Sequence, residues 1–69
     1  MKFNYSKLLG RIKECGYIHA TLAKAIGISK GTLSAKLNNL NFFTTKEIIA
    51  ICKVLNIAYK DIPLYFFVV

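Results

Sequence analysis

The chain has 69 residues, a formal net charge of +7 and a hydrophobic content of 55%. This length permits one domain, near the lower size limit for folding without metal or disulfide support, and the apolar content is sufficient for a core. With one histidine and three acidic residues, the chain lacks an acid–base constellation, so we expect no enzyme activity, no catalytic residue and no cofactor.

The cysteine pattern and the longest apolar run argue against two further classes of protein. Cys15 and Cys52 lack a CxxC spacing, which disfavours a metal site and favours small buried thiols in a reducing cytoplasm over a disulfide. The apolar run at residues 62–69 contains Pro63 and is too short to span a bilayer. We therefore expect a cytoplasmic protein without a metal site or a membrane association.

The first predicted helix begins near Asn4, a residue type that caps helices, with Phe3 placed to pack on Leu8. Gly16 is expected to end it. Apolar residues at helical spacing form its predicted inward side, namely Leu8, Leu9, Ile12 and Cys15.

Two short helices joined by a tight turn are predicted at residues 19–26 and 30–38. Gly27 favours the left-handed backbone at the end of the first, and Ser29 can cap the second. Leu33 and Leu37, four residues apart, turn the apolar side of the second helix inward. The residues left facing outward are then Lys30, Gly31, Thr32, Ser34, Ala35 and Lys36.

A fourth helix is predicted after Thr44, because Thr44 and Glu47 have the T-x-x-E spacing of a capping box. Asn56 is the expected left-handed terminator. A short fifth helix is predicted at residues 58–62, since Pro63 disfavours helical geometry at the residue before it.

Residues 64–69 are uncharged and rich in aromatic and β-branched side chains, which predicts an extended tail. Two interpretations are open: the tail closes the core of its own subunit, or it packs against a second copy. The absence of charge favours the dimer contact. The expected organisation is a helical domain at residues 1–63 followed by a tail at residues 64–69.

The positive charge is unevenly distributed along the chain. No acidic residue lies between Glu14 and Glu47, an interval that contains Lys24, Lys30 and Lys36 as well as Lys46. A positive field centred on the two short helices indicates an anionic partner. The alternative interpretation is an ordinary solvated lysine surface.

Residues 16–39, GYIHATLAKAIGISKGTLSAKLNN, resemble the helix-turn-helix of Cro and lambda-repressor-like phage regulators, the Xre family. The chain's size also fits a phage Cro protein. The family usually has Thr and Gln where this chain has Ile18 and His19, and Ile18 cannot cap a helix. The resemblance implies an all-α bundle of four to five short helices. It also implies a transcriptional repressor in the bacterial host cytoplasm, bound as a homodimer to a near-palindromic double-stranded DNA operator.

The resemblance places the helix at residues 30–38 in the major groove of DNA. Lys30 is the candidate for guanine recognition, and the further base-reading candidates are Gly31, Thr32, Ser34 and Ala35. His19 could contact phosphate or be no more than a surface residue. The other candidate phosphate contacts are Lys36, Asn38, Asn41 and Lys46, with Lys24 less certain.

A second class of function remains open, in which the same bundle is a protein-binding module such as an antirepressor or an antitoxin-like partner. Its interface would be the apolar tail together with Phe42 and Phe43. These two phenylalanines could equally belong to the core.

Overall fold

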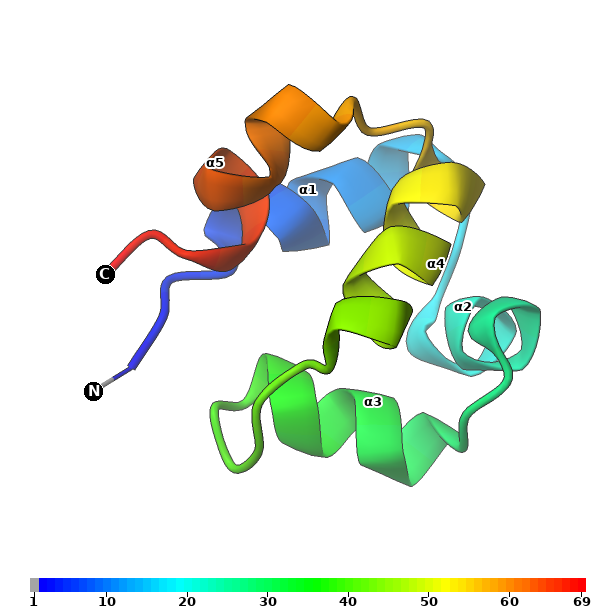
Figure 1. Ribbon diagram of the computed structural model, residues 1–69. Coiled ribbons are helices and arrows are strands. Elements are labelled where there is room, and N and C mark those ends of the chain that lie inside the picture. Colours follow the sequence, from blue (N-terminus) through cyan, green and yellow to red (C-terminus); the bar gives the residue numbers. More distant parts are fainter. Residues whose placement is uncertain (1) are drawn as a thin grey trace.

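The structure, a computed structural model, describes residues 2–69 and contains only helices and loops within them (Figure 1). The all-α prediction of four to five short helices is confirmed. In chain order the elements are α1 (Ser6–Glu14), α2 (His19–Ile26), α3 (Lys30–Leu37), α4 (Thr45–Leu55), a 3-10 turn (Tyr59–Asp61) and α5 (Ile62–Phe66).

Local sequence signals account for most helix boundaries. Gly27 ends α2 in the left-handed conformation, with φ at 81°, and the hydroxyl of Ser29 caps α3 by accepting from the amide of Thr32 at 3.1 Å. Thr44 and Glu47 form the predicted capping box of α4, which ends at Asn56 with φ at 55°. The structure confirms these boundaries. They could be predicted because each depends on residues close in sequence.

The helices are arranged around α4, which lies between two pairs (Figure 1). The first pair is α1 and α5, and the second is α2 and α3, the two helices of the tight-turn unit. Their buried side chains form one core, made of Tyr5, Leu8, Ile12, Leu22, Ala23, Leu33, Leu37, Ile48, Ile51, Cys52, Leu55, Ile57 and Phe66. None of the helices in residues 2–69 is both long and apolar enough to cross a membrane.

The amino-terminal segment differs from the prediction. Asn4 does accept a hydrogen bond from a backbone amide, that of Ser6 at 2.9 Å, but α1 starts only at Ser6. Phe3 packs on other aromatic rings, including Tyr5 at 6.2 Å between centroids. Leu9, expected to face inward, is 41% exposed.

The carboxyl-terminal segment also differs, since residues 64–66 are helical rather than extended. Pro63 lies in the first turn of α5, where a missing amide proton is harmless, so it begins this helix instead of ending the previous one. Phe66 is 1% exposed and belongs to the common core. The division between a domain at residues 1–63 and a separate tail therefore does not describe the packing.

Both cysteines are free thiols. Cys52 is buried in the core, and this burial raises the pKa of its thiol. Cys15 is half-buried, and its sulfur lies 3.7 Å from the carbonyl oxygen of Leu55. No cluster of three or more metal-binding side chains occurs in residues 2–69.

Candidate functional site

The predicted base-reading residues do not share one environment on α3. Lys30, Gly31 and Thr32 are exposed in its first turn, whereas Ser34 and Ala35 are half-buried. The Thr32 hydroxyl lies 2.8 Å from that of Ser29, so it takes part in the cap of its own helix. Only the first turn of α3 therefore presents freely accessible side chains from this set.

His19 and Ser34, predicted for different roles, lie against each other. The Nδ1 atom of His19 is 3.2 Å from the hydroxyl oxygen of Ser34, which joins the start of α2 to the middle of α3. His19 is half-buried. This contact uses polar groups that were expected to reach phosphate and base edges.

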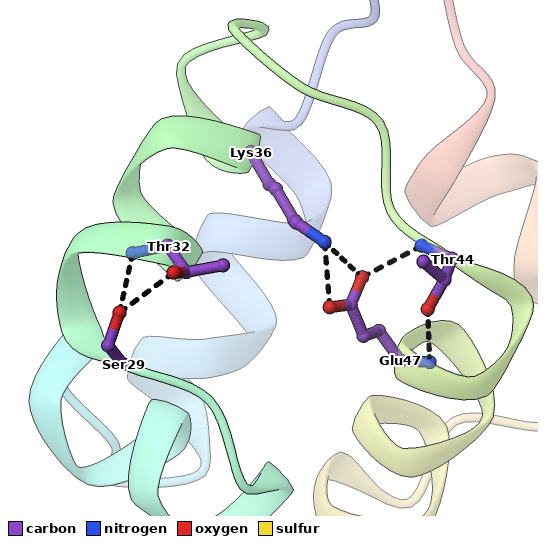
Figure 2. A network of polar contacts seen from close by, with 5 residues as sticks. All are labelled: Ser29, Thr32, Lys36, Thr44 and Glu47. Carbon is purple, nitrogen blue, oxygen red and sulfur yellow. Dashed lines mark hydrogen bonds and ion pairs between the residues drawn. The ribbon is translucent and has the colours of Figure 1, made fainter.

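The expectation that Lys36 faces outward is wrong. Lys36 is 8% exposed, and its ammonium donates to both carboxylate oxygens of Glu47, at 2.5 and 2.7 Å (Figure 2). This lysine lies three residues after Leu33, and i and i+3 share a helix face, so it points towards α4. Its charge is neutralised inside the protein rather than available to a phosphate.

The Lys36–Glu47 ion pair is joined to the start of α4. Glu47 also accepts a hydrogen bond from the amide of Thr44 at 2.8 Å (Figure 2). Burial would by itself raise the pKa of the Glu47 carboxyl, but the hydrogen bonds from Lys36 and Thr44, together with the charge of Lys36, outweigh it and lower that pKa. The pair therefore ties α3 to α4.

The remaining predicted phosphate contacts are exposed and lie on three elements. Asn38 follows the last residue of α3, Asn41 lies in the loop before α4, and Lys46 is in the first turn of α4. Lys24, on α2, is also exposed. The structure thus places Asn38, Asn41 and Lys46 outside the polar contacts that bind His19, Ser34 and Lys36.

An aromatic patch lies where the two ends of the chain meet. We use this name for Phe3, Phe42, Phe67 and Val68. The Phe3 ring is 6.3 Å from Phe42 and 5.6 Å from Phe67, both in edge-on geometry, and the amide of Asn4 donates to Val68. Phe42 is 72% exposed and Phe67 is 50% exposed, which leaves much of this patch in contact with solvent.

Phe43, by contrast, is part of the packing that holds α5 in place. Its ring lies 5.6 Å from Tyr5 and 5.5 Å from Phe66, again edge-on. Of the two adjacent phenylalanines in the α3–α4 loop, Phe42 belongs to the accessible surface and Phe43 packs against the core.

A second accessible feature lies between α1, the start of α2 and the start of α3. We call it the basic groove; its volume is about 440 Å³, and its lining is formed by Leu9, Ile12, Lys13, Tyr17, Ile18, His19, Ala20 and Lys30. Ile18 is 64% exposed. Among residues 2–69, no acidic side chain lines it.

Ile18 occupies an unusual position at the edge of this groove. It is the cap residue of α2, yet its side chain has no acceptor for a backbone amide. Thr21 compensates in part, since its hydroxyl accepts from the Ile18 amide at 3.0 Å and lies 3.1 Å from the Ile18 carbonyl oxygen. The sequence predicts only that Ile18 is a poor cap. The sequence signal for this site is a β-branched residue at a cap position, with Lys13 before it and Lys30 after it along the chain.

Comparison with known proteins gives a family for the chain. Residues 1–68 match the family described as "Protein of unknown function (DUF739)". The chain belongs to this family. Among curated proteins, no sequence matches it.

One solved structure connects the DUF739 chain to a phage regulator. It is the solution structure of the modulator of repression of the temperate bacteriophage TP901-1 from Lactococcus lactis. The two sequences are 40% identical, the TM-score is 0.82, and the match covers 97% of this chain and 90% of that one. The likeness therefore extends over nearly the whole fold.

This comparison overturns the Cro-like interpretation. The family is DUF739, and the neighbour modulates repression, so the identification as a Cro or Xre repressor is wrong, as are the operator DNA and the DNA-bound homodimer inferred from it. The local geometry of two helices joined at Gly27 is present. That geometry alone does not specify DNA binding, because one fold can support unrelated functions.

Proposed function

We propose that this protein is a protein-binding regulator that acts on a transcriptional repressor. The observation that carries the proposal is the 40% identity, over 97% of the chain, to a phage modulator of repression. Its role is binding rather than catalysis, and we place it in the cytoplasm of a bacterial host, where a phage repressor acts.

The contacts made by the polar side chains of α3 favour a protein over DNA as the partner. Lys36 is paired with Glu47, and Ser34 is in contact with His19, so part of the face expected to read DNA is satisfied within the chain. The aromatic patch and the basic groove instead offer apolar surface to solvent. Apolar side chains in a concave or clustered surface are typical of protein interfaces.

The net charge favours a different partner over a second copy of the chain. Two molecules of charge +7 repel each other, whereas a partner with an acidic face is attracted and its encounter is accelerated. The proposed repressor is therefore expected to present Asp and Glu side chains to this protein.

The proposal is tested with the purified chain and the repressor encoded in the same genome. We expect a saturable complex by isothermal titration calorimetry and by size-exclusion chromatography. In a bacterial reporter strain, expression from the repressor's operator should change when the chain is produced together with the repressor. It should remain unchanged when the chain is produced without the repressor.

Two outcomes would overturn the proposal. One is the absence of a complex with the repressor at concentrations where the chain remains folded by circular dichroism. The other is a reporter response to the chain alone, accompanied by operator binding without repressor. Binding to a random duplex at the same salt concentration is the control, because a chain of charge +7 attracts any nucleic acid at low salt.

A further inference from the structure

We infer that the basic groove is the docking site for an acidic segment of a partner protein, which inserts an apolar side chain between flanking carboxylates. This inference rests on the proposed function for the identity of the partner, and it goes beyond it by assigning the surface and the chemistry.

The shape of the groove fits an inserted side chain. Its volume of about 440 Å³ lies within the range of about 300–1,000 Å³ that is usual for binding pockets. Its apolar lining comes from α1 and from the segment before α2, where Leu9 is 41% exposed and Ile18 is 64% exposed. Covering these two side chains with an apolar group removes them from water, which favours binding.

The charge of the groove selects an acidic partner. Lys13 from α1 and Lys30 from α3 both line it, together with His19 at the start of α2. The neighbouring carboxylate of Glu14 is not among the lining groups and lies 3.7 Å from the guanidinium of Arg11. Because the groove has cations and no anion, a segment with Asp or Glu on both sides of its apolar residue is complementary to it.

The start of α2 adds to this complementarity. Ser29 and Thr44 cap α3 and α4 with their hydroxyls, whereas Ile18 leaves α2 without such a cap. The first amides of α2 therefore lack an acceptor from the cap residue. A carboxylate of the docked segment is suited to this position, where the partial positive charge of a helix start favours anions.

The apolar lining also distinguishes an acidic protein segment from nucleic acid. A DNA phosphate can pair with Lys13 or Lys30 but gains nothing from Ile18, which would remain exposed or be covered by a hydrated group. The aromatic patch has no comparable charge pattern, and nothing in the structure shows what covers it. The apolar and cationic lining of the groove therefore indicates the chemistry of its partner, whereas the aromatic patch does not.

The first test reverses the charge of the two lysines that line the groove. In a titration with the repressor of the same genome, Lys13→Glu with Lys30→Glu is expected to weaken binding about tenfold or more. The matched control is Lys53→Glu with Lys60→Glu, two exposed lysines outside the groove that change the net charge equally. The control is expected to remain within about threefold of the unmodified chain. Equal losses in the two double variants would overturn the inference.

The second test replaces the apolar side chain of Ile18 without weakening the fold. Ile18→Ser supplies the hydroxyl that α2 lacks, so the melting temperature should rise while binding to the repressor falls about tenfold. Leu40→Ser, at a position 74% exposed and outside both the groove and the aromatic patch, is the matched control and should leave affinity within about threefold. Full binding by Ile18→Ser, or a greater loss in Leu40→Ser, would overturn the assignment of the groove.

A third measurement separates the failure of this inference from the failure of the proposed function. The chain is used to select binders from a random peptide library, and the selected peptides are titrated into ¹⁵N-labelled chain. If the repressor does not bind but the peptides contain an apolar residue between acids and shift the amides of Ile18, His19 and Ala20, the groove stands and the partner is another protein. Peptides without acidic residues, or equal shifts of these amides by a random DNA duplex at the same salt concentration, would overturn the inference.

Discussion

In the middle of the chain and again in its carboxyl-terminal segment, two residues of the same type lie in opposite environments, one exposed and one buried. On α3, Lys30 is exposed beside the basic groove, whereas Lys36 is buried against Glu47. At the end of α5, Phe66 is buried in the core, whereas the adjacent Phe67 is half exposed. Residue type alone is therefore a poor guide to exposure in a bundle this small, because the partner that buries a side chain lies far away in sequence.

The largest expected difference in the free energy of unfolding is between variants of the two adjacent phenylalanines. Phe66→Ala leaves a cavity in the core and is expected to reduce the free energy of unfolding by about 3–5 kcal/mol. Phe67→Ala should reduce it by under about 1 kcal/mol, since half of that side chain remains in water. Urea titrations followed by circular dichroism measure both. Equal effects would show that residues 64–69 do not divide between core and surface as described.

The next test compares the two lysines of α3. Lys36→Ala leaves the Glu47 carboxylate, whose side chain is only 14% exposed, without its cation and is expected to reduce the free energy of unfolding by about 2–3 kcal/mol. Lys30→Ala, at an exposed position, should remain within about 0.5 kcal/mol of the unmodified chain. The same urea titration measures both variants. An unchanged free energy of unfolding in Lys36→Ala would mean that the ion pair does not hold α3 to α4.

A smaller loss of stability is expected when the cap of α3 is removed, because this cap is a contact between residues close in sequence. Ser29→Ala removes the hydroxyl that accepts from the amide of Thr32, and should lower the free energy of unfolding by about 1 kcal/mol. Thr45→Ala, at an exposed position in the first turn of α4, is the control and should stay within about 0.5 kcal/mol. Thermal melting compares the two, and a larger loss in Thr45→Ala would contradict the assigned cap.

The smallest expected effect is on the pH dependence of stability. The pKa of Glu47 is lowered in the folded chain, so its ionised form stabilises the fold above the ordinary value of 4.5. This contribution is lost as the pH falls through the lowered folded-state value. Glu47→Gln should therefore flatten the acid limb of a plot of unfolding free energy against pH. An acid limb as steep as that of the unmodified chain would remove Glu47 from this role.

The parts of the fold that could be predicted are those encoded by residues close in sequence. Gly27, Ser29 and the Thr44–Glu47 capping box mark helix ends through contacts within a few residues, and the structure has all of them. Pro63 was misread because the same residue fits both after a helix and in the first turn of one. The choice between these depends on whether Phe66 finds a place in the core.

The candidate site was harder to predict than the fold. Its residues come from α1, the start of α2 and the start of α3, and only packing brings Leu9, Lys13 and Lys30 around one groove. The DNA-binding interpretation relied on the helix-turn-helix pattern, which describes how two helices meet. Such a pattern does not specify the chemistry of the surface that the helices expose.

The sequence by itself determined a mainly helical chain, the end of α2, the start of α3, both ends of α4 and the strong positive charge, since each follows from local backbone preferences or from composition. Tertiary structure alone decided that Lys36 is neutralised by Glu47, that Phe66 is core, and that the exposed Ile18 lines one groove with Lys13 and Lys30. The physical reason is that burial and charge pairing depend on distances between residues that are remote along the chain. Those distances exist only once the helices are packed.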